Sequence, residues 1–185
     1  MRQATDLWEE VTPGVRDRHG NLPQLLTDLA FQAFLVGDSR NALTAVRRAR
    51  AMLDEQREPL LAACALRLDV LIRHSAGLTP GPPLVDSRRA LALASVAPES
   101  TEYAHCLADL ADHLMWSGEL DEALRCATEA VAVAERSGDL ATQSLALAAV
   151  ASVRAQDPES EELAREAVRR AISSGRRELD GVASI

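Results

Sequence analysis

The sequence predicts an all-α fold in which about four helical hairpins stack one after another. Hydrophobic residues make up 47% of the chain and aromatic residues only 3%. This balance suits closely packed helices better than strands, which favour β-branched and aromatic side chains. A pattern of small residues also recurs at intervals typical of helical-hairpin repeats. Glycine and proline breaks separate the apolar stretches that carry it.

The repeated pattern is an alanine, a small or β-branched residue four positions later, and a second alanine three positions further on. Its four copies begin 48, 33 and 41 residues apart. Positions with this spacing share one stripe of a helix, where small side chains let a neighbouring helix approach closely. The alanines expected to pack helices together are Ala42, Ala49, Ala90, Ala97, Ala123, Ala130, Ala164 and Ala171, with Val46, Ala94, Ala127 and Val168 between them.

The first hairpin is expected over residues 21–56. A helix over 22–36 ends at Gly37-Asp38, and its partner over 39–55 follows. Glycine is a common helix terminator because it adopts the left-handed conformation without strain.

The second hairpin is expected over residues 58–97, with helices over 60–75 and 84–96. The segment between them contains three prolines and two glycines, which cannot continue a helix. Pro98 then ends the second helix. This is the most loop-like connection in the chain.

The third and fourth hairpins are expected over residues 100–137 and 139–174. Ser100 is a suitable N-cap for the third hairpin, and the Ser117-Gly118 pair ends its first helix. Asp139 is the corresponding cap of the fourth hairpin, whose second helix follows Pro158.

The two ends of the chain are expected to hold partial elements. Residues 1–20 suggest a partial leading helix and loop, and residues 176–185 begin another helix. A weaker copy of the alanine pattern falls on Ala4, Trp8 and Val11. A repeat array usually closes with a polar capping helix, because its last apolar face otherwise meets water. We therefore expect a segment of a longer protein; the alternative is a small protein that self-associates through its terminal helix, as in a homodimer.

The third hairpin resembles a tetratricopeptide repeat (TPR). The matching residues are Leu107, Leu110 and Ala111, the run Gly118 to Ala123, and then Ala127 and Ala130. The first hairpin matches at Leu29-Ala30, Gly37-Asp38, Ala42 and Ala49. The aromatic residues and closing proline of the family are largely replaced. The resemblance implies a right-handed superhelix, or α-solenoid, of TPR-like hairpins whose first helices line a concave surface.

A second resemblance covers most of the chain. Residues 4–11, 98–104 and 107–134 are similar to the helical-repeat region of large actinobacterial regulators, the ATP-binding LuxR-type transcriptional regulators of the STAND class. That family implies an ATPase, a helical-repeat sensor arm and a helix-turn-helix module. Only the arm is expected here. The resemblance implies an interaction or ligand-sensing arm that signals to the other two modules and responds to a protein partner or to a small-molecule or peptide inducer.

Composition excludes several classes of function. The net charge of −8 argues against nucleic-acid binding, which needs a cationic surface. All 20 basic residues are arginine, so a Walker-type phosphate loop and a Schiff-base lysine are both ruled out. The three cysteines are widely spaced and are expected to be small buried thiols.

Neither a nucleophile elbow nor a Gly-rich dinucleotide loop occurs, so we expect no enzyme and no cofactor. The chain shows neither a membrane span nor a secretion leader, and a cytoplasmic location is expected.

One face of the third hairpin's first helix carries the main candidate site. His105, Asp109, Asp112 and Trp116 are spaced to share a face distinct from the leucine face. They would form an acidic, aromatic-ended strip that grips a peptide, sugar or amine; the alternative is an ordinary solvated helix face. His105, Asp109 and His113 are metal-ligand types spaced four residues apart, which suggests a metal site as a further hypothesis. The two histidines lie roughly 12 Å apart by helical rise, too far for one ion, so no metal is expected.

Two further groups of residues have competing interpretations. Phe31 and Phe34, beside Gln24 and Thr27, would form an apolar floor in the same concave channel, or pack against an adjacent helix as such phenylalanines more often do. The arginine clusters are Arg47-Arg48-Arg50, Arg88-Arg89 and Arg169-Arg170. They are interpreted as solvated faces paired with nearby carboxylates rather than as phosphate sites. The alternative to a sensing arm is a protein–protein scaffold without a small ligand.

Overall fold

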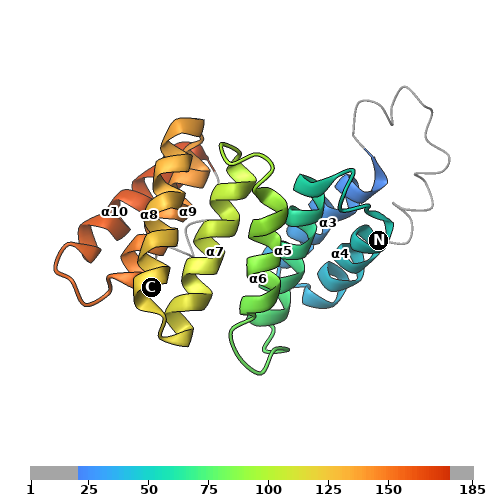
Figure 1. Ribbon diagram of the computed structural model, residues 1–185, viewed down its shortest axis with the longest axis horizontal. Helices are drawn as coiled ribbons and strands as arrows, with labels where there is room; N and C mark the ends of the chain where they lie inside the picture. Colours follow the sequence, from blue (N-terminus) through green and yellow to red (C-terminus); the bar gives the residue numbers. More distant parts are fainter. Residues whose placement is uncertain (1–20, 176–185) are drawn as a thin grey trace.

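The structure is a computed structural model, and it describes residues 21–175. Over that range it contains eight helices and no strand, which confirms the all-α prediction (Figure 1). The helices are α3 (Leu22–Leu35), α4 (Ser39–Met52), α5 (Pro59–Ser75), α6 (Leu84–Ala94), α7 (Thr101–Ser117), α8 (Leu120–Ser137), α9 (Leu140–Val153) and α10 (Ser160–Ser174). Their bounds agree with the sequence prediction to within about three residues. The partial elements expected over 1–20, with Ala4, Trp8 and Val11, and over 176–185 lie outside the described residues.

Side-chain caps and glycines set the ends of several helices. The Ser100 hydroxyl accepts a hydrogen bond from the Tyr103 N–H at 3.2 Å, and the Asp139 carboxylate accepts one from the Thr142 N–H at 2.9 Å. Each cap satisfies a backbone donor that the first turn of a helix leaves open. α7 ends at Gly118, whose φ of +82° is a conformation that residues with a Cβ rarely adopt.

The helices pack as four consecutive pairs, which follow one another from α3 and α4 to α9 and α10 (Figure 1). We call the first helices of the pairs (α3, α5, α7 and α9) the odd row, and the second helices (α4, α6, α8 and α10) the even row. Each odd helix contacts the next odd helix, whereas even neighbours do not touch to a comparable extent. The odd row is therefore a continuous layer, and the even row is more widely spaced.

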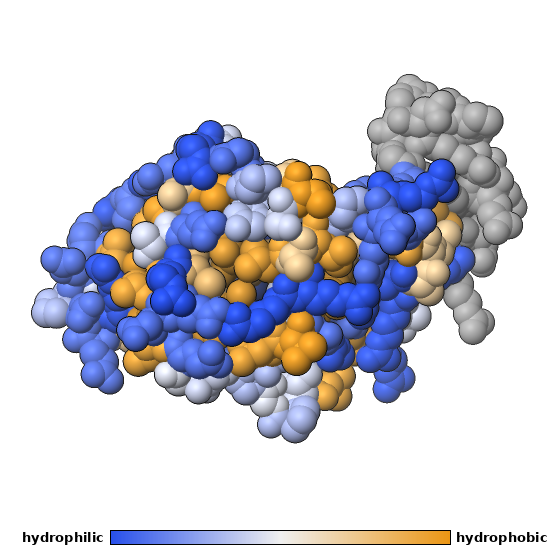
Figure 2. Space-filling model, in the orientation of Figure 1, coloured by the Kyte–Doolittle hydropathy of each residue, from blue (hydrophilic) through white to orange (hydrophobic). Residues whose placement is uncertain are grey.

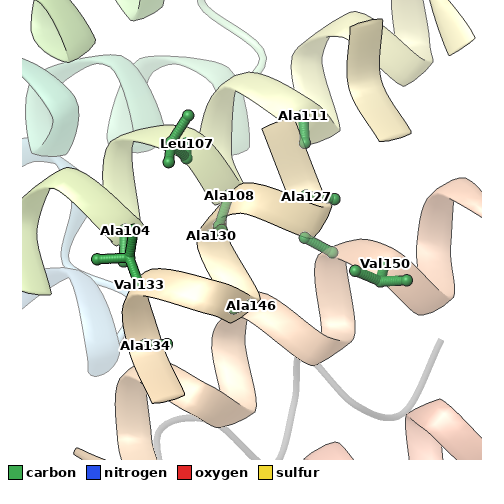
Figure 3. Packing of buried hydrophobic residues seen from close by; sticks show 11 residues of the cluster. Ala104, Leu107, Ala108, Ala111, Ala127, Ala130, Val133, Ala134, Ala146 and Val150 are labelled. Carbon is green, nitrogen blue, oxygen red and sulfur yellow. The ribbon is translucent and has the colours of Figure 1, made fainter. Parts of the chain in front are cut away.

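Small residues make this close packing possible. Between α7, α8 and α9, Figure 3 shows a cluster built largely from alanine. Of the alanines named in the repeated pattern, those that are almost completely buried are Ala42, Ala49, Ala90, Ala94, Ala123, Ala127, Ala130 and Ala171. An alanine contact leaves room for two helix backbones to approach, which larger side chains would prevent.

Two of the expected packing positions differ from the sequence prediction. Ala97 lies beyond the end of α6, which stops at Ala94, because a residue before a proline (here Pro98) disfavours the helical conformation. In α10 the fully buried alanines are Ala167 and Ala171, whereas Ala164 is only half-buried. α10 packs mainly on α9, so a narrower stripe of this helix is covered.

Candidate functional site

The predicted strip lies on α7, which sits between α5 and α9 in the odd row. His105, Asp109 and Asp112 are half-buried there, and Trp116 is 67% exposed. The structure gives these four side chains different partners. The strip therefore divides into a part that joins helices and a part that remains open.

Arg67 of α5 binds two carboxylates of α7. Its Nε donates to Glu102 Oε1 at 2.9 Å, and its Nη1 donates to Asp109 Oδ2 at 3.0 Å. The three side chains are only 14%, 15% and 17% exposed. Asp109, predicted as a ligand-binding residue, is thus occupied by an internal partner.

The charges of this cluster stabilise one another. Burial raises the pKa of the Glu102 carboxyl, but the Arg67 charge, with a further contribution from nearby His105, outweighs it and lowers that pKa to about 2. Burial alone would lower the pKa of the Arg67 guanidinium, and the charges of Glu102 and Asp109 instead raise it well above its ordinary value. Both groups are therefore charged at neutral pH.

His105 connects this cluster to α9. Its Nε2 lies 3.0 Å from Thr142 Oγ1, and the Thr142 hydroxyl donates to Asp139 Oδ2 at 2.5 Å. A hydroxyl has one proton, so Thr142 accepts from the His105 Nε2–H. The other ring nitrogen lies 3.8 Å from Glu102 Oε2. We call Arg67, Glu102, His105, Asp109 and Thr142 the inner network; it spans α5, α7 and α9.

Asp112 and Trp116 are the open part of the strip. No arginine among residues 21–175 forms an ion pair with Asp112. Burial and then the charge of Asp109 raise the pKa of the Asp112 carboxyl, while the charge of His74 and a hydrogen bond from Trp116 act in the opposite direction. This is a carboxylate without a strong cationic partner, placed beside an exposed indole.

The candidate residues on α3 do not join the strip. Thr27 is buried and donates to the Pro23 carbonyl at 2.8 Å, and Gln24 Nε2 donates to Asp28 at 2.9 Å. Phe31 and Phe34 pack against the cluster of α3, α4 and α5. This packing agrees with the interpretation that they pack against neighbouring helices.

The histidines of α7 do not converge on a metal position. His105 contacts Thr142, whereas His113 Nδ1 lies 2.8 Å from Ser87 Oγ of α6. Asp109, between them, is bound to Arg67. In the part of the chain that the structure describes, no group of three or more His, Cys, Asp or Glu side chains is placed to hold a metal ion.

The thiols beside the inner network are not activated. Cys64, Cys106 and Cys126 are free. Burial, followed by the charge of Glu102, raises the pKa of the Cys64 thiol to about 12. The thiolate is the reactive form of cysteine, so this environment favours an inert side chain.

Among residues 21–175, most of the surface arginines pair with carboxylates, as the sequence interpretation expected. We call three bridges that involve the even row and its adjoining turns the outer bridges: Arg89 with Glu55, Arg88 with Glu122, and Arg136 with Glu99. Figure 2 shows hydrophilic side chains forming a band across apolar patches on the face where α6 and α8 lie in front. Arg47 and Arg50 lie beside buried Asp69 and line a hollow of about 260 Å³.

Sequence reasoning missed the central residue of the site. Arg67 stands between Leu66 and Leu68, and its partners Glu102 and Asp109 lie 35 and 42 residues further along the chain. A charged residue flanked by leucines in an apolar helix is a usable signal, because a buried charge needs a partner. The sequence does not indicate which carboxylates supply it.

Comparison of the chain with protein-family models, curated proteins and solved structures found no match. Among the described residues, no helix combines the length and the apolar character needed to cross a membrane.

Proposed function

We propose that this chain is a TPR-like arm, a right-handed superhelix that binds a protein partner or a small ligand and catalyses no reaction. In this proposal it belongs to a LuxR-type regulator of the STAND class and signals to ATPase and helix-turn-helix modules outside this chain. The observation that supports it best is the odd row. Continuous contact between α3, α5, α7 and α9 is the arrangement expected when first helices form the inner layer of a solenoid.

The binding position in this proposal is the open end of the strip, and its ligand is a cationic group. Asp112 would supply the negative charge, and the exposed ring of Trp116 would supply an aromatic face for a cation–π contact. Such a group is found on an arginine or lysine side chain of a partner and on a small amine. The other two members of the strip have structural contacts instead: His105 contacts Thr142 of α9, and Asp109 binds Arg67 of α5.

Signalling would run through the inner network. A ligand shifts a conformational equilibrium only when it binds the two states unequally. Asp112 is three residues from Asp109, whose partner Arg67 belongs to α5. A cation at Asp112 changes the field at Asp109 and therefore the strength with which α5 holds α7.

A titration tests the ligand class. N-acetyl-arginine amide is added to the purified chain while the indole N–H signal of Trp116 is followed by nuclear magnetic resonance; the neutral isostere N-acetyl-citrulline amide is the matched control. We expect a saturable shift with the arginine compound alone. Asp112→Asn is expected to weaken binding about tenfold, since a charge-assisted contact is lost. Equal binding of both compounds, or an unchanged Kd in Asp112→Asn, would contradict this position.

Native mass spectrometry at several concentrations separates the arm from the alternative. A monomer of 19.9 kDa that carries a reproducible added mass supports the sensing arm. A dimer without added mass supports the second candidate, a self-associating scaffold. That candidate is favoured by apolar side chains left exposed where odd helices end and even helices begin: Val36, Leu78, Val85, Trp116 and Leu120.

A further inference from the structure

Two histidine rings meet where α5, α6 and α7 join. His74 lies in the last turn of α5, and His113 lies in α7. Their ring centroids are 5.2 Å apart and the rings are inclined by 77°, an edge-to-face contact. His113 is only 3% exposed, whereas His74 is half-buried. A titratable pair therefore lies inside the junction between the second and third helix pairs.

The hydrogen bonds around His113 fit a neutral ring. Ser87 Oγ lies 3.0 Å from the Pro83 carbonyl oxygen and 2.8 Å from His113 Nδ1. A hydroxyl has one proton and a carbonyl can only accept, so Ser87 donates to Pro83 and accepts from the His113 Nδ1–H. The ring thus joins α7 to the first turn of α6 through its Nδ1–H.

The surroundings of His113 act on its charge in both directions. Burial lowers the pKa of His113; the charge of Asp109 raises it, and the charge of His74 lowers it again. His74 Nδ1 lies 3.3 Å from Thr79 Oγ1, and its charge also acts on Asp112. The neighbouring Arg73 is held by Asp69 and Asp86, so two carboxylates that face this region are already paired.

We propose that the His74–His113 contact is an acid-sensitive joint: the neutral His113 ring holds α5 and α6 against α7, and protonation of this ring loosens them. Two like charges 5.2 Å apart repel, and the charge on His113 is separated from water. This inference stands apart from the proposed function, because it requires no ligand.

The direction of the pH effect follows from the lowered His113 pKa. Its ordinary value is 6.5, so the unfolded chain binds the proton more readily than the folded chain as the pH falls below 6.5. Stability is therefore highest above 6.5 and declines toward the lower, folded-state pKa. One such histidine changes the folding equilibrium constant by up to about tenfold per pH unit.

Urea unfolding at pH 7.5 and 5.5 tests the joint in the full chain. We expect the folding equilibrium constant to fall severalfold at pH 5.5. His113→Gln is expected to remove most of that loss, and His74→Gln the part that comes from repulsion between the two rings. His74→Gln alters a half-buried side chain, so it keeps the test valid should His113→Gln fail to fold. His105→Gln is the matched control, because this α7 histidine lies at Thr142 and is expected to leave the loss in place.

Hydrogen exchange locates the effect. After correction for the intrinsic exchange rate, amides of α6 are expected to lose protection at pH 5.5 in the native chain and to lose less of it in His74→Gln. An equilibrium constant that is unchanged between the two pH values would overturn the inference. The same conclusion would follow if both glutamine variants lost as much stability as the native chain.

Discussion

Arginine–carboxylate contacts occur in two different settings in this molecule. In the inner network, Arg67 and its two carboxylates are at most 17% exposed. In the outer bridges, the arginine side chains are 45% to 58% exposed. The chemical groups are the same, but water competes with the arginine–carboxylate contacts only in the outer bridges.

The difference in burial changes what each contact contributes. A buried guanidinium cannot be removed without leaving its carboxylates desolvated and unpaired. An exposed bridge gains little, because water and salt replace the missing partner. The outer bridges do recur with the repeat, since Arg89–Glu55 and Arg88–Glu122 each join residues 34 apart. The comparison predicts that the inner network determines stability and the outer bridges contribute little to it.

Arg67→Met is expected to have the largest effect. It keeps most of the side-chain volume but leaves Glu102 and Asp109 without their cation, so the free energy of unfolding should fall by about 3–5 kcal/mol. Urea unfolding followed by circular dichroism at pH 7 measures the change. A loss below about 1 kcal/mol would mean that the inner network contributes no more than an exposed bridge does. It would contradict the predicted difference between the inner network and the outer bridges.

Acid should weaken the inner network by a somewhat smaller amount. The folded-state pKa of Glu102 is about 2 against an ordinary value of 4.5, so its contribution is complete above 4.5 and is lost as the pH falls from 4.5 toward 2. This shift corresponds to about 3 kcal/mol. Thermal unfolding between pH 5 and 2.5 should therefore show a steeper decline in the native chain than in Glu102→Gln. Parallel declines would argue that Glu102 does not carry the effect.

Arg88→Gln should have the smallest effect. It removes an outer bridge to Glu122, and the free energy of unfolding is expected to fall by less than about 1 kcal/mol. Repeating the urea titration in about 1 M salt should abolish the remaining difference, because exposed charges are screened at that ionic strength. A loss of stability as large as that of Arg67→Met would show that the outer bridges stabilise the fold as much as the inner network does.

The fold could be predicted from the sequence more fully than the candidate site could. Helix bounds follow from local signals, such as the Ser100 cap and the glycine at 118, and these act within a few residues. The buried stripe of α10 was harder to place, because Ala164 and Ala167 both suit a stripe and only the neighbouring helix selects between them. The spacing of residues along the sequence does not show which of these two alanines is buried.

The site depended on contacts across the repeats. The sequence placed His105, Asp109, Asp112 and Trp116 on one face, and the structure keeps them on α7. The interactions of the first two are set by Arg67 and Thr142, which lie on other helices. Such pairings depend on how the helices are stacked, so the division of the strip into an occupied and an open part could not be predicted.

The wide spacing of the even row has a mechanical consequence. Charged side chains link α6 to Glu55 after α4 and to Glu122 of α8, while the odd row is in direct contact throughout. We therefore expect the molecule to be stiffer along the odd row than along the even row, and dissolved salt to weaken the outer bridges more than the buried inner network. Ionic strength would then adjust how easily the row of helices flexes without altering the layer about which it bends.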